Sequence, residues 1–367
     1  MKFTFDKDAM AKELSIAQEI ISTKNALSIL SNVYFSAENG SLTIKATDTK
    51  VNFETRIPVD IEEPGTTTVF CDKLLGTLNS LPSGDIELSQ TDSIIHIKPV
   101  NKKASFKLKS MASDKFPEFS INDSVPYFEI AAEEFKQMVT QTIFSVSDDQ
   151  ARYFMNGIFF EKKDENVVMV STDGRRLAFV SKALINSLEN FQPVIIPTKV
   201  LNIITKRASS EGLIFIAVLD KTIFFKFGNY ELSSVLIDGQ FPNYQRVIPE
   251  NQEKRFFVEK KDFVEALHRV GLYIEQKSRR IYFEINPGSL TISCQESEIG
   301  TAKEEIPCQY DGESMKIAVN YNYIDEPLKV INSDRVCVEF TESMRAITMK
   351  SEPAEDYFHI IMPMQME

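Results

Sequence analysis

A pattern of apolar and polar positions occurs three times along the chain, in residues 2–14, 127–139 and 255–267. Each copy begins with two apolar residues separated by one other residue, as a half-buried strand requires. It continues with apolar residues four positions apart, which is a helical spacing. The pattern recurs after about 125 residues, and a repeat of this length predicts similar units rather than one large core.

A second strand-helix pattern follows inside each unit, in residues 66–81, 192–205 and 315–331. Antiparallel hairpins are predicted by the alternating apolar residues that come next, in 85–99, 212–228 and 334–350. Each unit therefore contains two strand-helix-strands repeats, with the helices on one face of an antiparallel sheet. The predicted fold class is α+β, with three similar domains.

Two short segments are separated by the same distance as the repeats: FPEF at 116–119 and FPNY at 241–244. Each of them comes shortly before the next copy of the pattern. A proline after phenylalanine holds the chain extended, which suits a crossover between domains. We therefore expect the domains at residues 1–122, 123–250 and 251–367.

The segment VSTDGRRLAFVS, residues 170–181, contains a tight turn between two expected strands. Asp173 and Gly174 form a dipeptide typical of such turns, because glycine takes a positive φ at no steric cost. Two arginines, Arg175 and Arg176, follow at once. The segment is therefore either a simple hairpin or the rim of a site.

Composition narrows the class of protein. With 43% hydrophobic and 26% charged residues, the chain is expected to fold as a soluble globular protein. The apolar run at 212–219 is too short for a membrane span, and the start lacks the apolar core of a secretion signal, so we expect a cytoplasmic protein. The four cysteines lack CxxC spacing, which favours buried free thiols over a metal site or disulfides.

The residues that enzymes use are not arranged in a catalytic pattern. The glycine spacing excludes GxGxxG and Walker-A loops, and no GxSxG elbow occurs. His96, His268 and His359 lie singly in different repeats, which favours structural or surface roles. The pair Asp148 and Asp149 could hold a cation, but a solvated loop is the favoured interpretation. We expect a non-enzymatic protein without cofactor or metal.

Three motifs, STDGRRLA, GQFPNYQRVIP and the terminal IIMPMQ, occur on three repeated units in an order and spacing that resemble the bacterial β sliding clamp. This family is the processivity factor of replicative DNA polymerase III. The resemblance implies a homodimeric head-to-tail ring of six domains, with helices lining the inside and sheets outside. It also implies a set of partners: double-stranded DNA bound without sequence readout, the replicative polymerase, the clamp loader, and repair and translesion polymerases.

The net charge of −12 argues against a simple nucleic-acid binder unless basic residues gather on one face. A ring holds DNA by topology, so a few positive side chains facing the hole suffice. Candidates on or beside the six expected helices are Lys12, Lys24, Lys73, Lys136, Lys199, Lys206, Arg207, Lys261, Arg269 and Lys329. By resemblance, the residues that contact emerging DNA are Lys24, Gln150, Tyr153 and Arg246. Pro327 lies in the last expected helix, which is therefore expected to begin late or to kink.

The resemblance further implies a pocket that accepts a short linear peptide with apolar side chains. Its residues in this sequence are Met155, Thr172, Gly174, Arg175, Arg176, Leu177, Pro242, Val247, Ile360, Met362, Pro363 and Met364. On the residues alone, core positions and solvated arginines are the more ordinary interpretation, and the matched spacing reverses that preference. Arg175 stands where another residue is common in the family, so the peptide preference stays open.

By resemblance, the ring closes by pairing an edge of the first domain against the last domain, and this pairing would remove two open edges. The expected contacts are Leu78, Phe106 and Leu108 against Leu272 and Tyr273, with Glu298, Glu304 and Glu305 near. The alternative to a DNA-encircling clamp is a peptide-binding scaffold that does not encircle DNA, and the two differ in whether the basic residues of the helices share one face.

Overall fold

The computed structural model describes residues 1–21, 28–119, 125–183, 191–296, 298 and 300–366. The chain divides into two compact units, and each is described by itself. Unit 1 comprises Met1–Glu133 and Lys199–Leu236, and unit 2 comprises Glu134–Thr198 and Ile237–Glu367. Within the described part of the chain, every helix is too short or too polar to cross a membrane.

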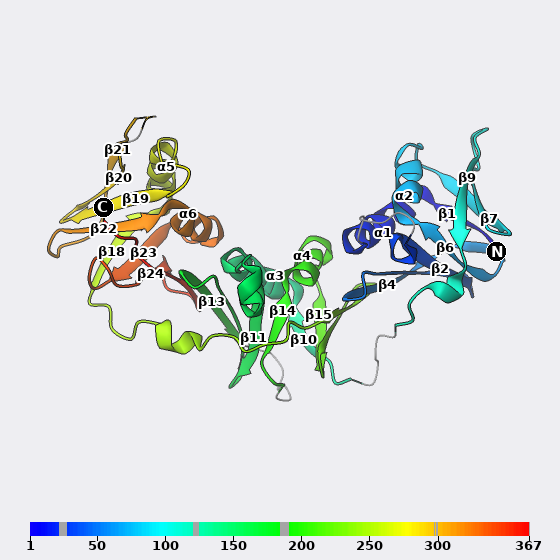
Figure 1. Ribbon diagram of the computed structural model, residues 1–367, viewed down its shortest axis with the longest axis horizontal. Helices are drawn as coiled ribbons and strands as arrows, with labels where there is room; N and C mark the ends of the chain where they lie inside the picture. The colour runs from blue at the N-terminus through cyan, green and yellow to red at the C-terminus, as the bar shows by residue number, and fades with distance from the viewer. Residues whose placement is uncertain (22–27, 120–124, 184–190, 297, 299, 367) are drawn as a thin grey trace. The chain divides into compact units, whose positions relative to one another are not determined.

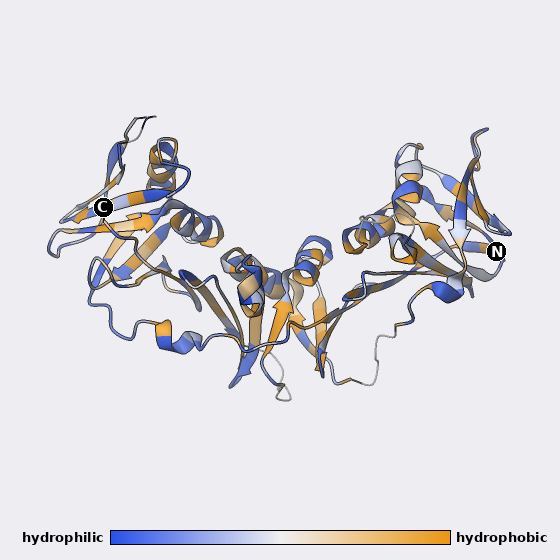
Figure 2. Cartoon of the chain, in the orientation of Figure 1, coloured by the Kyte–Doolittle hydropathy of each residue, from blue (hydrophilic) through white to orange (hydrophobic). Residues whose placement is uncertain are grey.

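Unit 1 is built on one antiparallel sheet. Its strands are β1 (Lys2–Asp6), β2 (Asn32–Glu38), β3 (Ser41–Thr47), β4 (Val51–Pro58), β5 (Asp60–Glu63), β6 (Gly65–Phe70), β7 (Asp85–Thr91), β8 (Ile94–Pro99), β9 (Phe106–Met111), β10 (Phe128–Ala131), β15 (Leu213–Leu219), β16 (Thr222–Phe227) and β17 (Tyr230–Val235). They form a 13-stranded sheet in the order β10-β15-β16-β17-β4-β3-β2-β6-β9-β8-β7-β1-β5. Hydropathy alternates along these strands (Figure 2), and the apolar positions of β3, such as Leu42 and Ile44, are the buried ones.

The helices of unit 1 cover one face of this sheet. They are α1 (Lys7–Ile20), α2 (Cys71–Asn79) and α4 (Thr198–Arg207). Helix α1 begins where the side chain of Asp6 accepts a hydrogen bond from the Ala9 amide at 2.8 Å, and it buries Met10 and Leu14 completely. It packs beside α2 and against β3 and β4 (Figure 1). The first strand-helix pattern read from the sequence is confirmed.

Unit 2 contains two antiparallel sheets. Its strands are β11 (Gly157–Lys163), β12 (Asn166–Thr172), β13 (Arg176–Ala183), β14 (Val194–Pro197), β18 (Lys254–Glu259), β19 (Arg280–Asn286), β20 (Ser289–Cys294), β21 (Lys303–Pro307), β22 (Met315–Asn320), β23 (Arg335–Phe340), β24 (Ile347–Glu352) and β25 (Tyr357–Ile361). Eight strands are ordered β14-β11-β12-β13-β25-β24-β23-β18, and four are ordered β21-β20-β19-β22. The expected hairpins β7–β8, β15–β16 and β23–β24 are all confirmed.

The remaining helices are α3 (Ala132–Thr142), α5 (Lys260–Gly271) and α6 (Tyr321–Val330). Helices α5 and α6 pack against each other, α5 on β20 and β21 and α6 on β22 and β25. Helix α6 begins directly after β22, where the Asn320 side chain accepts from the Asn322 amide at 2.9 Å, and it continues through Pro327. Of the two alternatives expected for this helix, a late start or a kink, the late start is therefore wrong, because the Asn320 cap fixes the beginning of the helix.

At both boundaries between the expected domains, a strand of one repeat pairs with a strand of the next. Strand β17 of the central repeat pairs with β4 of the first, and β13 of the central repeat pairs with β25 of the last. The two halves of the central repeat consequently belong to different compact units. The four cysteines are buried free thiols, as expected.

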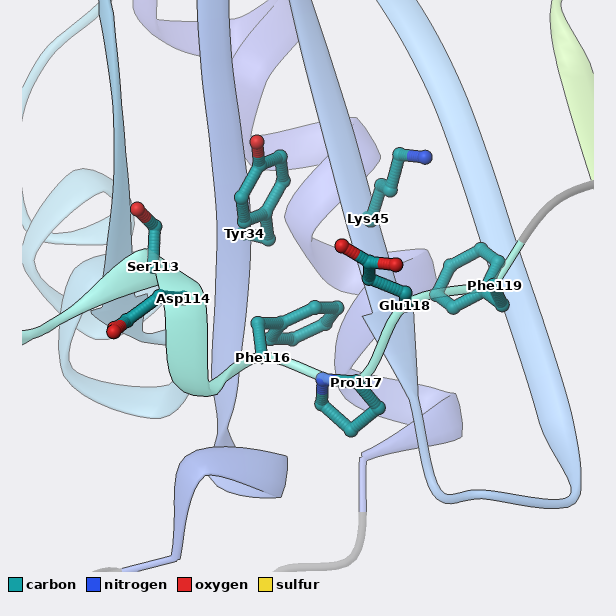
Figure 3. Close-up of a pocket in the computed structure, with 8 residues that line it drawn as sticks. All are labelled: Tyr34, Lys45, Ser113, Asp114, Phe116, Pro117, Glu118 and Phe119. Atoms are coloured by element: carbon teal, nitrogen blue, oxygen red, sulfur yellow. The ribbon is translucent and has the colours of Figure 1, made fainter.

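The FPEF segment leaves the first repeat across the face of the sheet that carries Tyr34 and Lys45 (Figure 3). Phe116 packs against Tyr34, with ring centres 5.5 Å apart, and the segment borders a hollow of about 620 Å³ (Figure 3). Lys45 lies 5.2 Å from the centre of the Phe119 ring in the same hollow. None of the site residues expected from the sequence lines it, and we interpret it as the place where the chain is anchored as it leaves the repeat.

Candidate functional site

The turn between β12 and β13 is fixed by its own side chains. Thr172 Oγ1 accepts from the Gly174 amide at 3.0 Å and donates to the Arg176 carbonyl at 2.6 Å. Asp173 Oδ1 accepts from the amides of Arg175 at 2.9 Å and Arg176 at 3.1 Å. Gly174 has a φ of +88°, and a Cβ there would lie 2.8 Å from Arg152 Nη1. The positive φ favours glycine here, whereas the Arg152 guanidinium is the end of a flexible side chain and can move aside.

Three distant segments meet beside this turn within unit 2. Leu177 pairs with Ile360 across β13 and β25, and both are 3% exposed. Phe241 and Tyr244 belong to the same buried cluster. The Met362 amide donates to the Arg175 carbonyl at 2.9 Å, which fastens the C-terminal segment to the turn. The structure therefore brings together the motifs that begin near residues 171, 239 and 360.

The expected pocket residues form a buried floor and an exposed rim. Met155 is buried at the end of the 3₁₀ helix η4 (Gln150–Met155), and Thr172 is also buried. Val247 is 54% exposed and Met362 45% exposed, which leaves two large apolar side chains in water. Pro242, Pro363 and Met364 are half-buried. An apolar floor under exposed apolar side chains is the arrangement expected of a surface that binds apolar peptide side chains.

Arg176, one of the expected pocket residues, is engaged in contacts within the chain. Its side chain is only 11% exposed, and its Nε lies 3.0 Å from Asp173 Oδ2. Its two terminal nitrogens donate to Glu326 and to the Phe144 carbonyl. The guanidinium also lies 4.6 Å from the centre of the Tyr323 ring. These donors therefore already have partners in the chain.

Arg152 is a site residue that the sequence analysis missed. Its Nε lies 2.9 Å from Asp149 Oδ2, its side chain is 46% exposed, and its Nη1 lies over Gly174. Asp149 also accepts from the Ala151 amide at 2.9 Å, so this aspartate caps η4. The three-residue spacing of Asp149 and Arg152 beside Tyr153 was the available signal. Arg175 is exposed.

His359 lies behind the turn on β25. It is 1% exposed, and its ring centre lies 5.5 Å from that of Phe144 and 5.7 Å from that of Tyr357. Burial, with a smaller contribution from the Arg176 charge, lowers the pKa of His359 to about 3. Neither of its ring nitrogens has a hydrogen-bond partner among the described residues. The imidazole is therefore neutral and structural, as expected for a lone histidine.

The described residues that are expected to contact DNA lie on two short helices that also carry expected pocket residues, Met155 on η4 and Val247 on the 3₁₀ helix η5 (Tyr244–Val247). Gln150 and Tyr153 belong to η4, and Tyr153 is 52% exposed. Arg246 is exposed on η5, next to Val247. Lys24 lies outside the described residues.

Several of the helix cations are engaged in ion pairs. Lys199 Nζ lies 2.6 Å from Asp48 and also donates to the Ile20 carbonyl at 2.7 Å, which fastens α4 to the end of α1. Further pairs join Arg207 and Lys206 to Glu19, Arg269 to Glu265 and Glu304, Lys329 to Asp325, and Lys73 to Asp72. Lys12, Lys136 and Lys261 also lie on their expected helices.

The residues expected at the ring interface divide into exposed and buried ones. Leu272 is 66% exposed and Tyr273 41% exposed, at the end of α5. Glu298 and Glu305 are exposed, and Glu304 pairs with Arg269 at 2.6 Å. Among the described residues, β21 pairs only with β20, so its other edge is open.

In the first repeat, Phe106 and Leu108 are half-buried on β9, whose residues 106–109 pair only with β8 in the described part of the sheet. Leu78 is a residue of α2 and is completely buried. We expected it at the interface, but it has no exposed surface that a partner could contact. Leu74 and Leu78 lie four positions apart on the helix face that packs into the core.

The chain matches the family models for three domains of the DNA polymerase III beta subunit. The N-terminal domain model matches residues 1–120, the central domain model 129–243, and the C-terminal domain model 245–365. A beta sliding clamp of Treponema pallidum is 47% identical over the full length of both chains. A Pseudomonas aeruginosa clamp structure with bound griselimycin superimposes with a TM-score of 0.94 over the full length of both chains, at 26% identity.

These matches define the class of protein as a bacterial replicative polymerase subunit built from three repeated α+β domains. The chain belongs to the β sliding clamp family. The three-domain fold and the family inferred from the sequence motifs are both confirmed.

Proposed function

We propose that this clamp closes with a second copy into a ring around duplex DNA and binds its partners through the surface formed by the turn at 173–176, η5 and the C-terminal segment. The observation that carries the proposal is the exposure of Val247 and Met362 beside the buried pair Leu177 and Ile360. The free energy falls when a partner covers apolar side chains that were exposed to water. The griselimycin complex of the Pseudomonas aeruginosa relative supports a ligand-binding surface in the family.

The partners follow from the family and the surface. DNA polymerase III is the first, and we include the clamp loader and the repair and translesion polymerases because one apolar surface can serve several peptides, particularly where methionine adapts to each. Duplex DNA is contacted without sequence readout, with Lys24, Gln150, Tyr153 and Arg246 nearest to it. The protein then acts in the cytoplasm, where bacterial DNA is replicated.

The ring interface is proposed to join the open edge of β21 to the open stretch of β9. Leu272 and Tyr273 would cover the apolar face of Phe106 and Leu108, and pairing both edges would remove a liability for aggregation. Leu78 supports the first-repeat side from the core without contact.

The test of the peptide surface uses exposed residues. Truncating Met362 or Val247 to alanine should weaken binding of a fluorescein-labelled peptide with the C-terminal clamp-binding segment of the polymerase by about ten-fold, since about 1.4 kcal/mol of apolar burial is lost. Fluorescence anisotropy measures the affinity. Val100→Ala is the matched control, because Val100 is 58% exposed and lies in the first repeat.

Leu177→Ala is a poor test by itself, because removing a buried leucine leaves a cavity and lowers the free energy of unfolding by about 2–5 kcal/mol. Unchanged affinity in both Met362→Ala and Val247→Ala, with folded proteins, would locate the peptide site elsewhere.

A further inference from the structure

Arg176 connects the turn of the candidate site to helix α6. On one side its Nε binds Asp173 Oδ2 at 3.0 Å, and Asp173 Oδ1 in turn holds two amides of the turn. On the other side it donates to the carboxylate of Glu326 and stacks on the ring of Tyr323. The two ends of this network are 150 residues apart in the sequence.

The α6 side of the network is rigidly placed. Tyr323 and Glu326 are three residues apart and therefore share a helix face, and both reach the same guanidinium. The helix is capped by Asn320 and packs on β22 and β25, and β25 carries Ile360 of the apolar floor. Glu326 is 30% exposed at its side chain and touches the turn through Arg176 in the contacts described above.

The consequence for the turn follows from charge and geometry. Asp173 can hold the amides of Arg175 and Arg176 only while its carboxylate keeps its orientation, and Arg176 fixes that orientation. The guanidinium is largely withdrawn from water, so it needs its second carboxylate to stay where it is. Without Glu326, the turn and the Met362 segment that is fastened to Arg175 would sample other conformations.

We propose that Glu326 is a positioning residue for the peptide-binding site, acting through Arg176 to hold the turn at 173–176 in the conformation that binds a partner. The inference rests on the proposed function of that site. It adds a residue on a helix of the last repeat to a surface formed by strands and loops. By reciprocity, a bound peptide also stabilises the contact between the turn and α6.

The experiment compares neighbouring acidic residues of α6. Glu326→Gln removes the charge and keeps an acceptor, and Glu326→Ala removes both. The matched control is Asp325→Asn, because Asp325 is the neighbouring acidic residue and pairs with Lys329 at 2.5 Å on the same helix. The same labelled polymerase peptide is titrated by fluorescence anisotropy into each full-length variant.

The expected losses are graded. A charge-assisted hydrogen bond is about twice as strong as a neutral one. We therefore expect peptide affinity to fall about five-fold in Glu326→Gln and about ten-fold in Glu326→Ala. Asp325→Asn should stay within about two-fold of the parent protein. Arg176→Lys keeps the positive charge but removes the planar guanidinium that contacts several partners at once. Because both substitutions break the same network, the double variant with Glu326→Gln should lose less peptide-binding free energy than the sum of the two single losses.

Amide hydrogen exchange provides a readout that a general loss of stability does not reproduce. Exchange of the Gly174, Arg175 and Arg176 amides should be faster in Glu326→Gln than in the parent protein and unchanged in Asp325→Asn. The variants are compared when their unfolding temperatures are equal, so that a difference in exchange reports on the turn alone. Parent affinity in Glu326→Ala, or equal losses in Glu326→Gln and Asp325→Asn, would overturn the inference. If Met362→Ala weakens the peptide while Glu326→Ala does not, this inference fails alone; if neither weakens it, the proposed site fails as well.

Discussion

Replacing Leu272 and Tyr273 together by alanine should separate the proposed ring into folded monomers. Leu272 is 66% exposed and Tyr273 41% exposed, so both have apolar surface that a second copy would cover. Because they lie at and after the end of α5, their truncation removes little from the core.

The magnitude follows from these exposures. Full burial of one large apolar side chain contributes about 1.5–3 kcal/mol, so the exposed parts of the two residues together are worth about 2–3 kcal/mol per interface. A closed ring of two copies has two equivalent interfaces, which doubles the loss to about 4–6 kcal/mol. Since about 1.4 kcal/mol corresponds to a factor of ten, the dimer dissociation constant should rise by about a thousand-fold to ten-thousand-fold.

The assay is sedimentation velocity over a dilution series, with circular dichroism to establish that the variant is folded. A matched control is Leu213→Ala with Phe215→Ala, an exposed aliphatic and aromatic pair on β15, each 39% exposed and outside the proposed interface. The control pair should leave the dimer unchanged. A Leu272 and Tyr273 variant that sediments as the parent dimer at every dilution would refute this interface.

Two further predictions concern pH and topology. The folded pKa of His359 is about 3, below the ordinary value of 6.5, so the unfolded chain binds the extra proton and stability is lost as pH falls below about 6.5. His359→Leu should therefore show a smaller fall in unfolding temperature between about pH 7 and pH 5 than the parent, and parallel curves would contradict the burial of a neutral imidazole. A clamp placed by a loader on nicked circular DNA should be released when the circle is cut and should depend only weakly on salt. Equal retention on linear DNA with free ends would contradict encirclement and favour a scaffold.

The repeat and most of the secondary structure could be predicted because local periodicity carries them. Phe3, Phe5, Met10 and Leu14 are buried as the alternating and helical spacings require. The pairing of β17 with β4 and of β13 with β25 was not predictable, since an alternating pattern marks the buried face of a strand but not the neighbour on its edge. These two ladders are what join the repeats.

The candidate site shows the same division. The spacing that placed Leu78 on a buried helix face was evidence against an interface role, and the structure agrees with the spacing. Arg176 and Arg175 are adjacent and look alike in sequence, yet one is withdrawn into contacts with Asp173 and Glu326 while the other is exposed. A contact across 150 residues leaves no local signal in a single sequence.

The ion pairs of the helix cations explain how an acidic chain can contact DNA weakly. Exposed ion pairs such as those of Lys73, Lys206 and Lys329 are worth only about 0–1 kcal/mol, so a phosphate can replace the carboxylate at little cost. The displaced carboxylate stays nearby and cancels part of the gain, so each such cation attracts DNA weakly. Weak contacts would be a defect in a protein that grips DNA. In a ring such weak contacts lower the barrier to sliding, because retention depends on closure.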